Sequence, residues 1–190
     1  MKKGLLIILS GPSGVGKGTV RRYIMDNFNL KLNYSISMTT RPQREKEVDG
    51  VDYYFVSKEE FQRRIDNDEF LEHQEFVGNY YGTPKDKVEE LRNSGKHVFL
   101  EIEVMGATEV MSKVNDDRVI SFFLMPPNID ALESRIRRRK TESEEIIRER
   151  LEKGKKEMSM ASHYDHVVLN DDIARVSQEI VDLIKKKLKQ

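Results

Sequence analysis

The stretch SGPSGVGKGT, Ser10–Thr19, directly follows five apolar residues at Leu5–Leu9. Its Gly11, Gly16 and Lys17 match the spacing G-x-x-x-x-G-K of a phosphate-binding loop. Glycines allow the backbone to curl so that its N–H groups converge on phosphate oxygens, and a following helix adds the positive end of its dipole. The apolar run is typical of a strand buried on both faces. The sequence therefore predicts a strand, a loop that binds a nucleoside triphosphate, and a helix beginning near Lys17.

One position departs from the full motif. After the lysine the motif has Ser or Thr, whose hydroxyl ligates Mg²⁺, whereas this chain has Gly18. Glycine offers no side-chain oxygen, so no protein ligand is certain. We expect magnesium to be carried with the nucleotide by phosphates and water, with Thr19 as the candidate protein ligand.

The composition limits the possible partners. The chain has 190 residues, a length that favours one domain with a real core. Its 33 Lys and Arg balance 33 Asp and Glu, so bulk charge gives no argument for a nucleic-acid partner. The absence of cysteine excludes disulfides and thiolate metal sites. The first apolar run is shorter than the roughly 7–15 residues of a signal peptide, and no run reaches the ~18 residues of a membrane-spanning helix. We expect a cytoplasmic protein with no membrane partner.

Short apolar runs alternate with helical patterns, which predicts an α/β fold with a parallel sheet flanked by helices. The expected strands are Leu5–Leu9, Val98–Ile102, Val119–Met125 and Val167–Leu169. The expected helices are Lys17–Phe28, Pro84–Asn93, Ile129–Arg139, Glu144–Met160 and Ile173–Leu188. Because Thr83 precedes Pro84, we expect a capping hydroxyl and then a proline to start the second helix.

The segment 37–81 has a different character. Two aromatic runs, VDYYFV from Val51 and QEFVGNYYG from Gln74, surround one helical pattern at Lys58–Asn67. This arrangement predicts an α+β insertion that buds from the core, rather than another strand–helix unit. We find neither a repeat of fixed period nor a low-complexity linker, which argues against a second independent domain.

Two arginines in this segment stand three residues apart, Arg41 and Arg44, around Pro42. The residue before a proline is extended and polyproline II turns every three residues, so both side chains are expected on one side of a stiff strand. Guanidinium forks are natural partners of a phosphate group. Beside a phosphate-binding loop, the pair predicts a second phosphate site, which would hold an acceptor.

The chain resembles the guanylate kinases, enzymes that make GDP from GMP. The motifs that carry the resemblance run in the family's order along almost the whole chain: SGPSGVGKGT, SISMTTRPQR, DYYFV, FLEHQEFVGNYYGT, LEIEVMGA, RRRKTES and LND. The resemblance implies one domain, residues 1–190, with a P-loop NTPase core (about 1–36, 92–125 and 151–190), an inserted GMP-binding α+β subdomain (about 37–91) and a small lid (about 126–150). It also implies transfer of the γ-phosphoryl group of ATP to GMP, with Mg²⁺ as the cofactor.

The resemblance further implies roles for individual residues. The GMP phosphate would be held by Arg41, Arg44, Tyr53 and Tyr81, and the guanine by Ser37, Glu72 and Thr83. The ATP-binding residues would be Gly11, Pro12, Ser13, Gly14, Val15, Gly16, Lys17, Gly18 and Thr19, with Asn170 near the adenine. The catalytic residues would be Lys17 and Arg44 together with Arg135, Arg139 and Arg150 from the lid and its flanking helix. Glu101 and Glu103, where relatives often carry aspartates, would join the GMP-binding residues and face the magnesium and nucleotide cleft.

Other interpretations remain open for single residues and for the whole chain. Tyr53 and Tyr81 also suit a sheet face, Glu72 an exposed carboxylate, and the lid arginines a solvated helix face. His163 and His166 lack a nearby third ligand that a metal site would need. The alternative functions are a catalytically silent phosphoprotein-binding module of the same fold, and a P-loop NTPase or kinase with another acceptor. The sequence does not indicate an oligomeric state.

Overall fold

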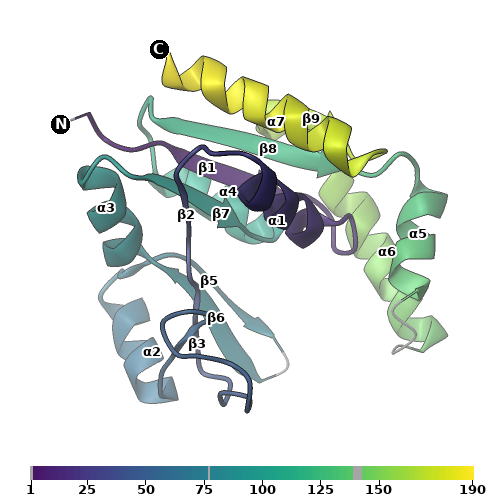
Figure 1. Cartoon of the computed structure of the whole chain (residues 1–190). Coiled ribbons are helices and arrows are strands. Elements are labelled where there is room, and N and C mark those ends of the chain that lie inside the picture. Colours follow the sequence, from purple (N-terminus) through teal and green to yellow (C-terminus); the bar gives the residue numbers. More distant parts are fainter. Residues whose placement is uncertain (1, 77, 139–142) are drawn as a thin grey trace.

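The computed structural model describes residues 2–76, 78–138 and 143–190, and its centre is a five-stranded parallel sheet (Figure 1). The strand order is β2-β7-β1-β8-β9. The strands are β1 (Leu6–Ser10), β2 (Leu32–Tyr34), β7 (His97–Glu101), β8 (Val119–Met125) and β9 (His166–Leu169). All neighbours pair in parallel, which confirms the predicted α/β class, although β2 is absent from the expected strands.

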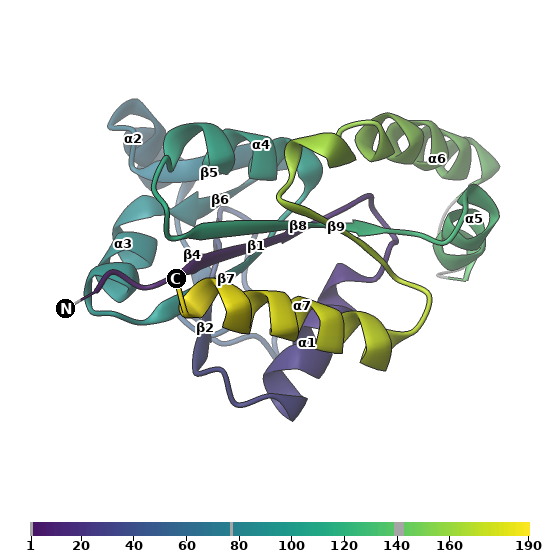
Figure 2. The same cartoon turned by 90° about the horizontal axis from the view of Figure 1, so that it is seen from above.

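Strand β1 is buried along its length and apolar up to its last residue, Ser10, because helices cover both faces of the sheet (Figure 2). The covering helices are α1 (Lys17–Asn27) and α7 (Ile173–Leu188) on one face, and α3 (Lys85–Asn93) and α4 (Val104–Lys113) on the other. Ile7 and Leu9 belong to the core with α1 and α7, whereas Leu6 and Ile8 belong to the core with α3 and α4. The sheet therefore separates two cores, and the glycine loop leaves it at the end of β1.

The predicted α+β insertion is a second, four-stranded sheet with one helix. Its strand order is β4-β3-β6-β5, and only the β3–β4 pair is parallel. The elements are β3 (Met38–Thr39), β4 (Tyr54–Phe55), α2 (Lys58–Asp66), β5 (Phe70–Phe76) and β6 (Asn79–Pro84). A small core of its own includes Phe61 and Phe70, whose rings stack with centroids 4.4 Å apart. Helix α4 of the main core packs against β5, so the two sheets are joined there.

Helices α5 (Ile129–Arg137) and α6 (Glu144–Met158) form another excursion, which the short helix η1 (Ala161–His163) follows. Figure 1 shows this helix pair and the second sheet with α2 projecting from the same side of the central sheet, at opposite sides of the view. The pair is anchored because Leu132, Ile136 and Ile147 belong to the core with α1 and α7. Two excursions thus flank the end of the sheet that carries the glycine loop.

Two features differ from the expectations. Helix α4 has no counterpart among the expected helices, although its buried Val104 and Ala107 show the helical i, i+3 spacing. The hydroxyl of Thr83 does not cap α3: strand β6 continues through Pro84, which is itself the N-cap, and no side chain caps this helix. The expected capping role of Thr83 is therefore wrong, and its hydroxyl is available to another partner.

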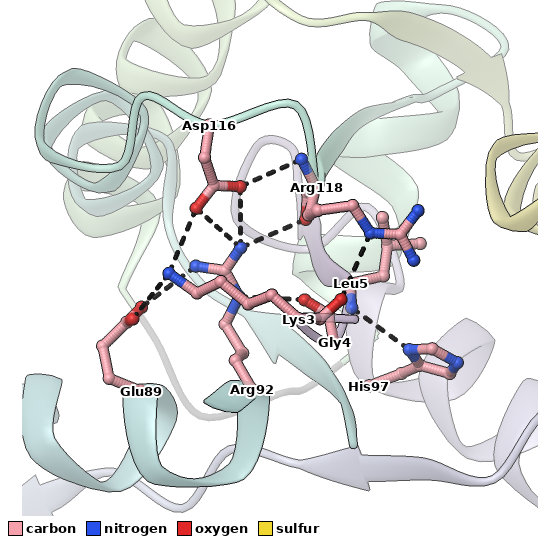
Figure 3. A network of polar contacts seen from close by, with 8 residues as sticks. All are labelled: Lys3, Gly4, Leu5, Glu89, Arg92, His97, Asp116 and Arg118. Carbon is pink, nitrogen blue, oxygen red and sulfur yellow. Dashed lines mark hydrogen bonds and ion pairs between the residues drawn. The ribbon is translucent and has the colours of Figure 1, made fainter. Parts of the chain in front are cut away.

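A polar network closes the end of the sheet opposite the loop (Figure 3). The guanidinium of Arg92 has no exposed surface and donates to the carbonyls of Gly4 and Arg118, at 3.2 and 3.3 Å. It also donates to both oxygens of Asp116, at 2.8 and 2.9 Å, and to Glu89 at 3.0 Å. Because these partners come from α3, the start of the chain and the turn before β8, the network fixes their relative positions.

None of the helices formed by the described residues combines the length and the apolar composition that crossing a bilayer requires.

Candidate active site

The glycine loop has the conformation that its sequence predicts. Gly14 and Gly16 have φ angles of 86° and 102°, in the left-handed region that favours glycine. A side chain at Gly11 would place its Cβ only 2.5 Å from the carbonyl oxygen of Leu124. Gly16 is the N-cap of α1, and the first turn of this helix carries no acidic residue. The first turn of the helix therefore contributes no acidic side chain of its own to offset the positive end of the dipole.

Lys17 is folded back over the loop. Its ammonium donates to the carbonyl of Gly11 over 2.7 Å and forms an ion pair with Glu103 at 3.4 Å. Only 8% of Lys17 is exposed, whereas Thr19 is exposed on the first turn of α1. The structure thus places the predicted lysine, Glu103 and the loop carbonyls together.

Side chains from α5, from α6 and from the residue that follows β9 also hold the loop. Arg135 on α5 donates to the carbonyls of Val15 and Asn170, at 2.8 and 2.9 Å. The Asn170 amide also donates to the carbonyl of Val15, at 2.8 Å. Arg150 on α6 donates to the hydroxyl of Ser13 over 2.6 Å. These three predicted residues meet at the loop, but their contacts with the transferring phosphoryl group and with adenine remain predictions. The fourth, Arg139, lies outside the described residues.

Two further residues on the same face of α6 escaped the sequence analysis. A Cβ at Gly154 would lie 3.0 Å from Cδ2 of Leu132 on α5 and 3.7 Å from the Cβ of Pro12, so the glycine allows α6 to pack closely on α5 next to the loop. Glu157, one turn later, is 4% exposed, and burial raises the pKa of its carboxyl. Its ion-pair partner is Lys153 at 3.6 Å. The spacing of Arg150, Gly154 and Glu157, i, i+4 and i+7, is the signal that would have indicated this face.

Glu101, the last residue of β7, lies beside the first turn of α1. Arg21 donates to its Oε2 over 2.7 Å, and the Arg21 guanidinium lies 4.2 Å from the centroid of the Tyr34 ring. The other oxygen, Oε1, is 3.3 Å from the position that a Cβ on Gly18 would take. The structure therefore places both predicted acids next to the phosphate loop, Glu101 at the end of β7 and Glu103 at the N-cap of α4. A contact of either with GMP remains a prediction.

The four residues predicted to hold the acceptor phosphate belong to the second sheet: Arg41, Arg44 and Tyr53 lie in the connection between β3 and β4, and Tyr81 lies on β6. The guanidinium of Arg41 lies 5.5 Å from the Tyr53 ring centroid, and the Tyr53 and Tyr81 rings meet edge to face with centroids 6.1 Å apart. Glu47 joins the two arginines, because its carboxylate accepts from the Arg41 guanidinium at 2.7 Å and from the Arg44 backbone N–H at 2.9 Å. The sequence analysis missed Glu47. Its position three residues after Arg44 is the signal that would have indicated a carboxylate paired with the arginines.

The residues predicted to recognise guanine centre on a buried carboxyl. Glu72 is 7% exposed, and the fully buried Thr83 donates to its Oε1 over 2.7 Å. Burial raises the pKa of Glu72 to about 7. The other oxygen, Oε2, lies where only a glycine leaves room: a Cβ at Gly106 on α4 would be 2.8 Å from it. Ser37 is partly exposed, and its carbonyl accepts from the backbone N–H of Tyr54 at 2.9 Å. The interpretation of Glu72 as an ordinary exposed carboxylate is excluded.

The first turn of α4 connects the two groups of residues. Its N-cap, Glu103, pairs with Lys17 of the phosphate loop. Gly106, one turn along, abuts Glu72 of the second sheet. The two sites therefore lie side by side, separated by a single helical turn. No group of three or more His, Cys, Asp or Glu within the described part of the chain is arranged to hold a metal ion by itself.

Comparison with known families and proteins agrees with this geometry. The sequence model of the family described as "Guanylate kinase" matches residues 3–187. A guanylate kinase of Mesoplasma florum is 53% identical over 182 residues, which cover 96% of this chain and 61% of that relative. A guanylate kinase of Streptococcus pyogenes is 50% identical over 184 residues, which cover 97% of this chain and 86% of that relative. The chain thus spans less than two thirds of the Mesoplasma protein.

The fold is also found in a solved structure. The crystal structure of guanylate kinase from Anaplasma phagocytophilum superposes with a TM-score of 0.74 at 32% sequence identity. The match covers 98% of this chain and 87% of the other. The overall architecture of this chain is therefore one already observed by crystallography.

Proposed function

This chain belongs to the guanylate kinase family, and we propose that it transfers the γ-phosphoryl group of ATP to GMP, forming ADP and GDP. Its place would be in guanine nucleotide metabolism and GMP recycling. The residues 37–91 would form the GMP-binding subdomain and the residues 126–150 the lid, inserted in the core that binds ATP.

The observation that carries the proposal is the first turn of α4. At its N-cap, Glu103 pairs with Lys17 of the phosphate loop, and three residues later Gly106 abuts the buried Glu72, whose carboxyl suits the hydrogen-bonding edge of guanine. A guanine ring presents two adjacent donors, N1–H and the N2 amine, and the Glu72 carboxylate can accept both. Triphosphate binding alone would need only the loop. The second site beside it supports an enzyme with a nucleotide acceptor.

The acceptor needs no general base. A phosphate oxygen of GMP is already anionic at neutral pH, so it can attack the γ-phosphorus of ATP directly while the bond to the β–γ bridging oxygen breaks. Catalysis of such a transfer is mostly alignment and stabilisation of charge. Arg41 and Arg44 would hold the attacking phosphate in line, and Glu47 would keep the arginine loop in shape.

The ATP-binding side would be organised by the phosphate loop and by Arg135 and Arg150, which donate hydrogen bonds to it. The backbone N–H groups of the loop would bind the β- and γ-phosphates, and Lys17 would leave Gly11 and Glu103 to meet the charge that develops on them. Arg135 and Arg150 would shield the transferring group. Closure of the two excursions over both substrates would exclude water, which would otherwise hydrolyse ATP.

Magnesium fits the donor set beside the loop, because Mg²⁺ prefers oxygen ligands and usually combines one or two carboxylates with substrate phosphates. Glu101 supplies a carboxylate oxygen beside Gly18, and Thr19 supplies a hydroxyl on the first turn of α1. When bound with ATP, the ion would neutralise charge on the phosphates. The presence of Mg²⁺ is part of the proposal.

A location in the cytoplasm is also part of the proposal, and it rests on the short first apolar run and the lack of a long one in the sequence. The proposed partners are ATP and GMP, with no nucleic acid or membrane.

A coupled assay tests the activity. Purified protein with Mg-ATP should form ADP rapidly only when GMP is present, with AMP, CMP and UMP as comparison acceptors. GMP-independent ADP formation would favour an NTPase, and transfer to another acceptor a different kinase. Binding of GMP without any transfer would favour the silent phosphoprotein-binding module.

Two lysine variants make the assay specific to this site. Lys17→Ala should lose phosphoryl transfer and keep the fold, because the ammonium is needed only where charge develops on the phosphates. Lys156→Ala removes an exposed ammonium from α6 and should retain wild-type turnover. Wild-type turnover by folded Lys17→Ala would overturn the assignment of the loop.

A further inference from the structure

The carboxyl of Glu157 is enclosed next to the phosphate loop and takes no part in the proposed transfer. Glu157 is 4% exposed and lies on the same face of α6 as Arg150, which donates to the hydroxyl of Ser13 in the loop. Within the described part of the chain, neither of its oxygens accepts a hydrogen bond. Burying a polar group without such a partner costs free energy, most of all when the group is charged. The fold keeps this carboxyl at a cost, which indicates a role other than stability.

The ion pair with Lys153 does not account for this burial. The Lys153 ammonium lies 3.6 Å from Oε1 of Glu157, and the lysine side chain is 56% exposed whereas that of the glutamate is 5% exposed. Pairs of this i, i+4 kind form on the outer surface of helices and contribute little to stability. Because only the lysine lies at the surface here, the pair is a consequence of where the carboxyl lies and not its cause.

The other groups around the carboxyl belong mostly to the nucleotide site. Burial raises the pKa of Glu157, and the charge of Glu103 at the N-cap of α4 acts in the same direction. Lys17 and the backbone N–H of Ser13, both of the phosphate loop, act in the opposite direction. The remaining titratable neighbour is Tyr164, whose hydroxyl stays neutral because burial raises its pKa. Since a bound phosphate would engage the loop N–H groups and Lys17, the charge of the carboxyl depends on whether the loop is occupied.

We propose that Glu157 is a proton-accepting group of the nucleotide site, ionised while the loop is empty and protonated from the solvent when the phosphates of a nucleotide bind. Lys17 and the loop N–H groups would then turn to the phosphates, whose negative charge would stand beside a carboxyl that water hardly reaches. A like charge close by disfavours the ionised form, so the carboxyl takes up a proton. The inference rests on the proposed function only in assuming that the loop binds the phosphates of a nucleotide.

This coupling fixes the sign of the pH dependence. Bound phosphate raises the pKa of Glu157 above its value in the free protein, so between the two pKa values the complex holds more protons than the free protein. Nucleotide affinity is therefore full below the pKa of the free protein, and it falls by up to about tenfold per pH unit as the pH rises through this interval. The terminal phosphate of ADP contributes no proton at pH 8, because the second pKa of a phosphate group is about 6.

Calorimetric titration of the whole protein with ADP measures the proton directly. The titration is run at pH 8 with EDTA and without GMP, in buffers of different ionisation enthalpy. The wild type should take up about half a proton or more per ADP bound, and its ADP affinity should fall about three- to tenfold between pH 7 and 9. Glu157→Gln, which is neutral and of the same shape, should take up no proton and should bind ADP with the same affinity across this range.

Two further variants locate the proton. Glu152→Gln removes the same charge from an exposed position of α6, where the side chain is 66% exposed, and should retain the uptake. Glu103→Gln removes the more exposed acid that pairs with Lys17, whose partner side chain is 47% exposed, and should also retain it. Thermal melts establish that each variant is folded, and the wild-type proton count stands even if one variant does not fold.

Three results would overturn the inference. The first is ADP binding to the wild type without proton uptake at pH 8. The second is uptake that persists in Glu157→Gln or disappears in Glu103→Gln alone. The third is equal weakening of ADP binding by Glu157→Gln at every pH, which is the result that a merely structural role would give. Any of these would leave the proposed function standing, since GMP-dependent ADP formation tests it separately, whereas a wild type that does not bind ADP would overturn both.

Discussion

The hydroxyl of Thr83 donates a 2.7 Å hydrogen bond to Oε1 of Glu72, and the two residues face each other across the β5–β6 pair. Both are buried, and the second oxygen of Glu72 lies against Gly106. A carboxylate so confined has few rotamers left. It therefore presents hydrogen-bond acceptors in a fixed position, which is what discrimination between guanine and adenine requires.

Glu72→Gln is expected to lower kcat/KM for GMP about tenfold or more, since a hydrogen bond to a charged group contributes roughly 1.5–3 kcal/mol. The amide presents a donor to one of the guanine donors, whereas adenine has an unprotonated N1 and no N2 amine. The preference for GMP over AMP should therefore narrow. Glu75→Gln, on the exposed part of the same strand, is the matched control. If the preference ratio does not change, guanine is recognised elsewhere.

The affinity for GMP should rise with pH between about 6 and 8. Burial raises the pKa of Glu72 to about 7, so below that pH the carboxyl is protonated in the free protein. It must lose this proton before it can accept two guanine donors, so GMP binding releases a proton and weakens up to about tenfold per pH unit below the pKa. Calorimetry in buffers of different ionisation enthalpy measures the release. Glu72→Gln retains the titration of the GMP phosphate and should lack this additional proton.

Gly106→Ala should weaken GMP binding without unfolding the protein. The new Cβ would lie 2.8 Å from Oε2 of Glu72 and push the carboxylate out of place. To accept guanine the carboxylate must return to its place against the new Cβ, and overpacking of this kind costs about 1–3 kcal/mol, so GMP affinity should fall roughly tenfold. Alanine is about 1 kcal/mol better than glycine inside a helix, which offsets part of the crowding, so Tm should change by only a few degrees. Met105→Ala, at the exposed neighbouring position, is the control. Unchanged GMP affinity in Gly106→Ala would contradict the role of this contact.

Arg92→Met should destabilise the fold and leave the active site intact. Removing one partner of a buried ion pair costs about 3–5 kcal/mol, which corresponds to a fall in Tm of roughly 6–20 °C for a domain of this size. The carbonyls of Gly4 and Arg118 and the carboxylate of Asp116 would lose the hydrogen bonds that Arg92 donates in Figure 3, and Asp116 would keep only those from Lys3 and the Arg118 N–H. Thermal unfolding measures the loss, and Arg22→Met, at an exposed position of α1, is the control. Asp116→Asn should cost less in the Arg92→Met background than in the wild type. Equal costs in both backgrounds would mean that the pair is not coupled.

The sequence by itself determined the features that depend on neighbours along the chain. The glycine loop was predictable because its left-handed φ angles need glycines at fixed spacing, and Gly14 and Gly16 have such angles. The strands of the parallel sheet were predictable as short apolar runs because both faces are covered, and only the short β2 escaped. The pairing of Arg41 with Arg44 followed from their spacing around Pro42, whereas Tyr53 and Tyr81 were added to them by the resemblance.

Only the tertiary structure decided which distant side chains share a surface. Helix α4 escaped the sequence analysis, yet its first turn joins the phosphate loop to Glu72. Thr83 looked like a helix cap by its position before Pro84, but its hydroxyl faces a carboxyl eleven positions away in sequence. The contacts of Glu101 with Arg21 and Gly18 cross from β7 to α1. Local patterns report backbone preference and burial, whereas these contacts depend on how separate elements pack, which no single stretch of the chain encodes.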